Sequence, residues 1–177
     1  MRPTEVVKKA VKKVVPVVRP KSVTTTSEKG LEFIARFEGT RSQYGPFLYN
    51  DPVGYATLGY GHLLHRSGVT AQDIRQYKGF TNADAIRLLG QDVKRFEPAV
   101  RSLGVKLTQT EFDALVSFAF NLGPGALEGG IKSALRRGDK RGAMDVLQQY
   151  CHANGEVLTG LVRRRAAESD LFLKGRY

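Results

Sequence analysis

The sequence has little cysteine, no long apolar run and no internal repeat. Its 177 residues include one cysteine, Cys151, so an intrachain disulfide scaffold is excluded and the chain suits synthesis in a reducing cytosol. The longest apolar runs are only a few residues, far below the roughly 20 that a transmembrane helix needs. With 41% hydrophobic and 25% charged residues, the composition is that of one globular domain with a short appendage.

Acidic residues are also scarce relative to basic ones. The chain has 28 lysines and arginines against 17 acidic residues, a net charge of +11. Such a chain favours a polyanionic partner, and charge alone does not choose between nucleic acid, an anionic membrane and a bacterial wall polymer. Residues 1–29 hold eight basic and two acidic residues, a net charge of +6. The sequence therefore predicts a basic tail, residues 1–27, and a less basic body, residues 28–177.

The tail alternates apolar and basic pairs between Val6 and Val15. On a helix its apolar residues would share one face and its lysines the other. Pro16 and Pro20 would end such a helix and favour an extended connector. Lysines interrupt the apolar stretch and no cleavage site follows it, so we do not expect a signal peptide. Two interpretations stay open: a solvated tail, or an amphipathic segment that folds on an anionic membrane or on a partner protein.

The body combines a glycine-rich and tyrosine-rich stretch with several helical patterns. Thr25-x-x-Glu28 has the spacing of a capping box and predicts a helix that ends at Gly39. Residues 44–64 predict short strands and tight turns. Two further capping-box spacings begin at Thr81 and Thr108. The helices expected beyond residue 80 cover 85–97 (closed by Pro98), 112–122, 131–137, 140–150 and 161–174. This order of elements predicts an α+β fold.

Two carboxylates stand in contrasting surroundings. Glu38 ends an apolar helix, a setting that disfavours the charged form and suits a general acid. Asp51 lies in a polar turn that would keep it ionised. Thr57, six positions later, would face the same cleft if the strands pair as a hairpin, and could position a water. Such a pair of carboxylates is what glycoside hydrolysis needs. Considered alone, Glu38 would be interpreted as a surface residue at a helix end, and Asp51 as a residue that caps a turn.

The combined pattern resembles the catalytic signature of phage-type lysozymes, the endolysins of glycoside hydrolase family 24. That signature is a helix ending in Glu-Gly followed by Asp-x-x-Gly-x-x-Thr-x-Gly-x-Gly-His, and here it reads Glu38-Gly39 and then Asp51 through His62. Segments 115–125 and 160–168 also match, so the resemblance covers about residues 28–175. The interval from Glu38 to Asp51 is longer than in the family, and we assign the extra residues, 42–46, to a longer surface loop.

The resemblance implies a lysozyme-like fold, with a small antiparallel sheet lobe, a mostly helical lobe and the active-site cleft between them. It implies that Glu38 is the proton donor, Asp51 the second carboxylate and Thr57 the water-orienting hydroxyl. The implied reaction is hydrolysis of the β-1,4 bond between N-acetylmuramic acid and N-acetylglucosamine in peptidoglycan. The implied substrate-binding residues are Leu63, Phe120, Asn121 and Ser133. The resemblance also implies that Arg164 pairs with Glu38, and that His62 pairs with Asp92.

Other signals in the sequence are weaker. His62, His65 and the pair Cys151-His152 do not complete a zinc-ligand set, so we expect no metal and no cofactor. Cys151 could be a nucleophile, but a lone buried cysteine in a helix more often serves packing, and packing is what we expect of it. The run 163–165 of three arginines could be a solvated helix face or contact nucleic acid, and we expect no specific nucleic-acid partner.

The leading interpretation is a monomeric muramidase for host cell lysis. It would be made in the host bacterial cytoplasm without a signal peptide and would act on the wall after release. One alternative is a wall-degrading lysozyme carried in a phage tail or injection device, docked to a virion protein through the basic tail. Another is a non-catalytic basic binder of anionic membrane or nucleic acid. The intact set of Glu38, Asp51 and Thr57 favours an enzyme, because a binder would not need it.

Overall fold

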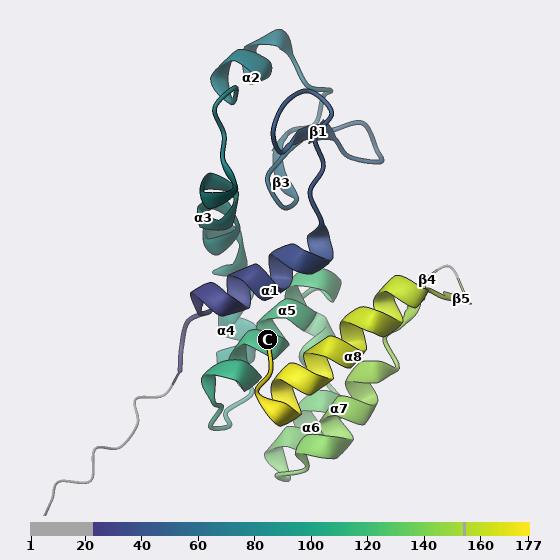
Figure 1. Ribbon diagram of the computed structural model, residues 1–177. Coiled ribbons are helices and arrows are strands. Elements are labelled where there is room, and N and C mark those ends of the chain that lie inside the picture. The colour runs from purple at the N-terminus through teal and green to yellow at the C-terminus, as the bar shows by residue number, and fades with distance from the viewer. Residues whose placement is uncertain (1–22, 154) are drawn as a thin grey trace, which may run out of the picture.

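The computed structural model describes residues 23–153 and 155–177, so the prediction of an amphipathic tail falls almost wholly outside the described residues. Within them the chain forms two lobes (Figure 1). The smaller lobe holds a sheet and one short helix: β1 (Leu48–Asn50), β2 (Ala56–Leu58), β3 (His62–His65) and α2 (Ala71–Gln76). Helix α3 (Asn82–Val93) leads from this lobe toward the larger one, and α1 (Glu28–Glu38) lies where the two lobes meet.

The larger lobe is almost entirely helical. Its elements are α4 (Glu97–Arg101), α5 (Gln109–Leu122), the 3-10 helix η1 (Pro124–Leu127), α6 (Gly130–Arg136), α7 (Lys140–Gln148), the short strands β4 (His152–Ala153) and β5 (Glu156–Val157), and α8 (Thr159–Lys174). Helix α5 contributes more buried residues than any other described helix, and it packs against α1, α4 and α8. The expected α+β architecture, a small antiparallel sheet lobe beside a mostly helical lobe, is confirmed. None of the described helices is long and apolar enough to cross a membrane.

The small sheet is an antiparallel meander in the order β1-β2-β3. Tyr49 of β1 pairs with Thr57 of β2, and the register between β2 and β3 shifts at Ala56/Thr57. The Asp51–Gly54 segment forms the turn that joins β1 to β2, with the Gly54 amide donating to the Asp51 carbonyl at 2.9 Å. The hairpin expected from the glycine-rich stretch is therefore present. The sheet is joined to α3 by His62, whose Nδ1 lies 3.0 Å from Asp92 Oδ2.

Helix starts follow the capping signals with one correction. The boxes at Thr81 and Thr108 are complete, although their helices begin at Asn82 and Gln109, earlier than expected. The first helix was wrongly assigned to a Thr25 cap. Ser27 is the N-cap, because its hydroxyl accepts the Gly30 amide at 3.0 Å and also reaches Asp113 of α5.

The end of α3 and two small elements also differ from expectation. Pro98 does not close α3, which ends at Val93; the proline instead sits in the first turn of α4, where its missing N–H costs no hydrogen bond. Helix α2 was missed although Thr70 and Asp73 form a third capping box. The hairpin of β4 and β5 was missed as well, because its strands have only two residues each.

A buried carboxylate ties both ends of the described body together. Asp113 is 0% exposed and accepts hydrogen bonds from the Ser27 amide at 3.0 Å and the Tyr177 hydroxyl at 2.6 Å. Burial, reinforced by the hydrogen bond to Asp113, raises the pKa of the Tyr177 phenol from 10.0 to about 12. The neutral phenol therefore stabilises the fold fully below about pH 10, and that contribution is lost as the pH rises through about 12.

This arrangement predicts an absorbance titration that isolates one tyrosine. Phenolate absorbance of the wild type minus that of Tyr177→Phe should titrate near pH 12, because only the first protein contains this phenol. The variant should also lose less stability than the wild type between about pH 10 and 12. A difference curve with a midpoint near 10 would show that the phenol is not held by Asp113 in solution.

Candidate active site

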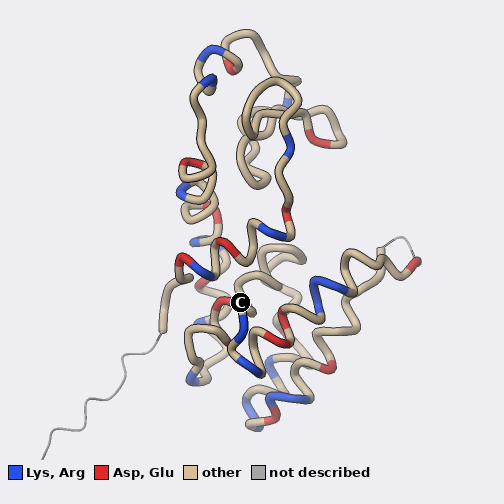
Figure 2. The backbone as a smooth tube through the Cα atoms, in the orientation of Figure 1, with Lys and Arg blue, Asp and Glu red and all other residues tan. Residues whose placement is uncertain are grey.

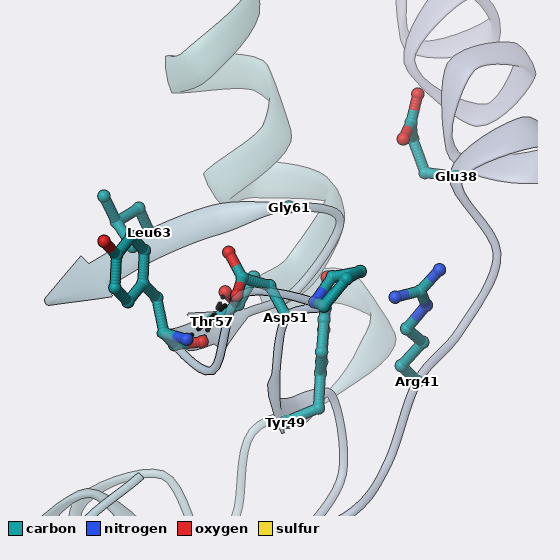
Figure 3. A pocket seen from close by; sticks show the side chains of 9 residues that line it. Glu38, Arg41, Tyr49, Asp51, Thr57, Gly61 and Leu63 are labelled. Atoms are coloured by element: carbon teal, nitrogen blue, oxygen red, sulfur yellow. Dashed lines mark hydrogen bonds between the residues drawn. The ribbon is translucent and has the colours of Figure 1, made fainter. Parts of the chain in front are cut away.

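A pocket of about 340 Å³ lies between the end of α1 and the small sheet. Its lining includes all three residues that the sequence assigned to chemistry, and Figure 3 shows Glu38 on one side of it and Asp51 and Thr57 on the other. The full lining is Glu38, Arg41, Tyr49, Asp51, Pro52, Tyr55, Thr57, Gly61 and Leu63. The longer loop between Glu38 and β1 therefore still lets the two carboxylates share one cavity.

Glu38 is the last residue of α1. The helix ends there because Gly39 has φ 70°, a left-handed value that glycine adopts without strain. The Glu38 side chain is 25% exposed, and its Oε1 accepts a hydrogen bond from Nη1 of Arg164 at 2.7 Å. No hydrogen bond within the described residues engages the other oxygen, Oε2. One oxygen is thus fixed by an arginine, and the second is available to a bound molecule.

Arg164 is itself held by a buried charge network. Its Nε donates to Glu168 at 3.2 Å and its Nη2 to the Ser117 carbonyl at 3.3 Å. Glu168 also accepts a hydrogen bond from Nη2 of Arg165 at 3.3 Å, and its Oε2 lies 2.9 Å from Nε of the same arginine. Burial raises the pKa of the Glu168 carboxyl and lowers the pKa of the Arg165 guanidinium, and the opposite charges counteract both shifts. The charges of the two arginines, Arg164 and Arg165, balance those of the two glutamates, Glu38 and Glu168. The network therefore fixes the orientation of Arg164 and, through it, of Glu38.

Asp51 sits at the start of the turn between β1 and β2. Its Oδ1 accepts the amides of Val53 and Tyr55, each at 2.9 Å. Backbone donors of this kind fix a carboxylate's orientation without neutralising its charge. Its Oδ2 accepts no hydrogen bond within the described residues, which leaves an oriented anionic oxygen at the pocket. Unlike Glu38, Asp51 forms no ion pair with any residue that the structure describes.

Thr57 lies in β2, on the same side of the pocket as Asp51 (Figure 3). It is 4% exposed, and its hydroxyl donates to the Tyr55 carbonyl at 3.1 Å. With its hydrogen committed, the hydroxyl oxygen retains acceptor capacity toward the pocket. The arrangement places an anionic acceptor and a hydroxyl oxygen where both could hold one water.

Of the four predicted substrate-binding residues, one lines the pocket and three do not. Leu63 lines the pocket and is 45% exposed. Phe120, Asn121 and Ser133 belong to the helical lobe and are outside the pocket lining. Asn121 accepts a hydrogen bond from Arg165 at 2.8 Å, and the Phe120 ring packs edge-on against Phe96. Their contact with substrate stays a prediction.

Two pocket residues outside the motif from Asp51 to His62, Tyr49 and Arg41, were not identified from the sequence. Tyr49 lies in β1 and precedes Asp51, the first residue after that strand, by two positions, so the alternation of the strand directs both side chains toward the pocket. Burial raises the pKa of its phenol, and the nearby Arg41 acts in the opposite direction. Arg41 follows Glu38 by three positions and lies with its guanidinium 5.6 Å from the centre of the Tyr49 ring. The strand periodicity could have revealed Tyr49, whereas nothing local indicates where Arg41 points.

The histidines and the cysteine do not form a metal site among the described residues, where no group of three potential ligands comes together. His65 instead bonds Asp73 and Ser67. Cys151 was expected in a helix and is not, because α7 ends at Gln148; it is half-buried beside the β4–β5 hairpin.

Comparison with known proteins identifies the family. The sequence profile described as phage lysozyme matches residues 35–168, most of the chain. The chain belongs to the phage lysozyme family. Its domain is therefore that of a muramidase, a glycoside hydrolase, as the motif from Glu38 to His62 predicted.

Individual known proteins resemble this chain in sequence and fold. The chain is 35% identical to the endolysin of Bacillus phage B103 over 84% of its own length, and it spans about half, 54%, of that endolysin. The muramidase domain of SpmX from Asticaccaulis excentricus has a TM-score of 0.68 at 35% identity, covering 85% of this chain and 99% of that one. P22 lysozyme, in a mutant form, gives 0.69 at 28% identity with coverages of 85% and 99%.

Proposed function

We propose that this protein is an endolysin-type muramidase that hydrolyses the β-1,4 bond between N-acetylmuramic acid and N-acetylglucosamine in peptidoglycan, for host cell lysis. The observation that carries the proposal is the shared pocket, in which the carboxyl group of Glu38, held by Arg164, stands across from the carboxylate of Asp51. Membership of the phage lysozyme family supports it.

In this proposal Glu38 donates a proton to the leaving glycosidic oxygen. Arg164 fixes Oε1, so that Oε2 can carry the proton into the cavity. Asp51 stabilises the positive charge that develops on the sugar, and with Thr57 it positions the attacking water. Leu63 contacts the sugars at the pocket, and Phe120, Asn121 and Ser133 extend the binding surface onto the helical lobe. No metal or cofactor takes part in these steps.

A clearing assay tests the proposal directly. Wild-type protein should reduce the turbidity of a suspension of purified peptidoglycan and generate new reducing sugar ends. Clearing that is accompanied only by new amino groups would mean cleavage of peptide bonds, and the absence of any hydrolysis would favour the binding-module alternative.

The binding-module alternative has little support in the charge distribution. Figure 2 shows acidic and basic residues interspersed over both lobes, without a continuous basic track on the part of the chain it colours. A nucleic-acid-binding surface normally gathers its basic residues on one face. Of the three arginines in the run 163–165, two are buried and committed to Glu38, Asn121 and Glu168. We therefore propose no specific nucleic-acid partner.

The basic tail, residues 1–27, is proposed to attach the monomeric catalytic domain, residues 28–177, to an anionic surface. The enzyme would be made in the host cytoplasm and would act on the wall after release. Docking to a virion protein is the competing use of the same tail.

Deletion of residues 1–26 tests this role. It removes seven basic residues and only Glu5, a net charge of +6. Each basic residue near an anionic membrane contributes about 1 kcal/mol. Binding to vesicles rich in anionic lipid should fall on deletion and should fall with added salt in the full chain, while hydrolysis of soluble wall fragments stays unchanged. Equal binding of both forms at low salt would exclude the membrane role.

A further inference from the structure

The pocket contains a cation, Arg41, that no acidic residue in the described part of the chain neutralises. Arg41 lines the cavity together with Glu38 and Asp51, and its side chain is exposed. Its guanidinium takes part in no ion pair or hydrogen bond with any residue that the structure describes, although Asp51 lines the same pocket. Arg164, in contrast, is buried and donates to Glu38 and Glu168. The donors of Arg41 are therefore available to a ligand.

The position of Arg41 is restricted by an aromatic ring. Its guanidinium carbon lies 5.6 Å from the ring centre of Tyr49, a side chain that is only 8% exposed. Contact with a fixed ring limits the conformations open to the arginine and so reduces the entropy lost on binding. Figure 3 shows Arg41 on the same side of the pocket as Glu38, across from Leu63 and Thr57.

The electrostatics of the pocket identify the kind of group that Arg41 would bind. Asp51 contributes a negative charge that no described residue pairs with, and this charge would repel an anionic substrate unless a cation offsets it. A guanidinium fork matches the geometry of a carboxylate better than an ammonium group does. In peptidoglycan the sugar rings are neutral, and carboxyl groups occur on the side group of N-acetylmuramic acid: on its lactyl ether when that is free, or on the stem peptide attached to it.

We propose that Arg41 is a specificity-determining residue that binds a carboxylate of the muramoyl side group next to the bond that is cleaved. The inference rests on the proposed muramidase function. In this inference Arg41 distinguishes N-acetylmuramic acid from N-acetylglucosamine, the neutral sugar next to it in the glycan chain.

The experiment compares three substrates. The first is soluble glycan–peptide fragments of purified peptidoglycan with their carboxylates intact. The second is the same fragments after conversion of all carboxylates to primary amides. The third is strands stripped of peptide, which carry only the lactyl carboxylate. For each substrate, kcat/KM is measured for the wild type, Arg41→Gln, Arg41→Lys and Arg66→Gln. Arg66 is the matched control, an exposed arginine of the same lobe outside the pocket lining.

Arg41→Gln should lower kcat/KM about tenfold on intact fragments and less than about twofold on amidated ones, because a charge-assisted hydrogen bond is lost only where a carboxylate is present. Amidation should lower the wild-type value by a similar factor, and Arg41→Lys should lie between. A loss on stripped strands shows that Arg41 binds the lactyl carboxylate where it is free, and a loss confined to the peptide-bearing fragments assigns a carboxylate of the stem peptide as its partner. The kcat/KM of Arg66→Gln should stay close to that of the wild type on all three substrates.

Two results would overturn the inference. One is an equal loss for Arg41→Gln on intact and amidated fragments, which would mean that Arg41 supports the fold or the chemistry instead of recognising substrate. The other is a wild-type kcat/KM that is the same on intact and amidated fragments. This measurement uses only the wild type, so it does not depend on whether a variant folds. Failure of the proposed function is distinguishable from both, because then the wild type would cleave no glycosidic bond in any of the three substrates.

Discussion

The Glu38→Gln variant should remain folded and lose wall-clearing activity by about 10²–10⁴-fold. The glutamine amide cannot supply the proton that the leaving oxygen needs, and general acid catalysis contributes a factor of this size. Folding should survive, because the amide oxygen can still accept the hydrogen bond that Arg164 donates to Oε1. Turbidity clearing of purified peptidoglycan measures the activity, and thermal unfolding measures the stability.

Glu32→Gln is the matched control for this variant. Glu32 is an exposed glutamate in the same helix, outside the lining of the catalytic pocket, so the same chemical change there should leave clearing unchanged. A folded Glu38→Gln protein that clears at nearly the wild-type rate would remove Glu38 from the mechanism.

The second large effect is expected on the other side of the pocket. Asp51→Asn should lose about 10²–10³-fold in kcat, because it removes the negative charge that would stabilise the transition state. The turn should persist, because the asparagine oxygen can accept the amides of Val53 and Tyr55 as the carboxylate does. Asp145→Asn, at an exposed aspartate of α7, removes one charge away from the pocket and should be silent.

Thr57→Val separates the chemical role of the hydroxyl from its structural one. The change removes a single hydrogen bond to the Tyr55 carbonyl, which contributes about 1 kcal/mol to stability. If the hydroxyl helps Asp51 hold the water, kcat should fall well beyond what this small destabilisation explains. A normal kcat in both Thr57→Val and Asp51→Asn would show that these two residues do not position the attacking water.

Local signals explain why much of the fold could be predicted. The capping boxes at Thr81 and Thr108 involve residues three positions apart, so the sequence displays them directly. The start of α1 could not be decided locally, because several hydroxyl residues precede it. Ser27 is selected by contacts with Asp113, which lies 86 positions away. Pro98 was misjudged because a proline that ends one helix and a proline that begins the next look alike in sequence.

In the site, too, contacts between residues close in sequence could be predicted from local patterns and contacts between distant residues could not. Asp51 and Thr57 lie within one hairpin, and their common orientation follows from strand pairing. The pairing of Glu38 with Arg164 spans 126 positions and was indicated only by resemblance to phage-type lysozymes. Arg41 was overlooked because it belongs to a loop, where no periodicity relates a residue to the pocket it faces.

The identity of the newly formed reducing sugar decides whether this protein is a muramidase. Purified peptidoglycan is digested with the wild type, the new ends are reduced with borohydride, and the reduced sugars are identified by mass spectrometry. Cleavage at the proposed bond places reduced N-acetylmuramic acid at every new end, with none produced by Glu38→Gln. New ends that carry reduced N-acetylglucosamine, or a digest without new reducing ends, would contradict the assignment.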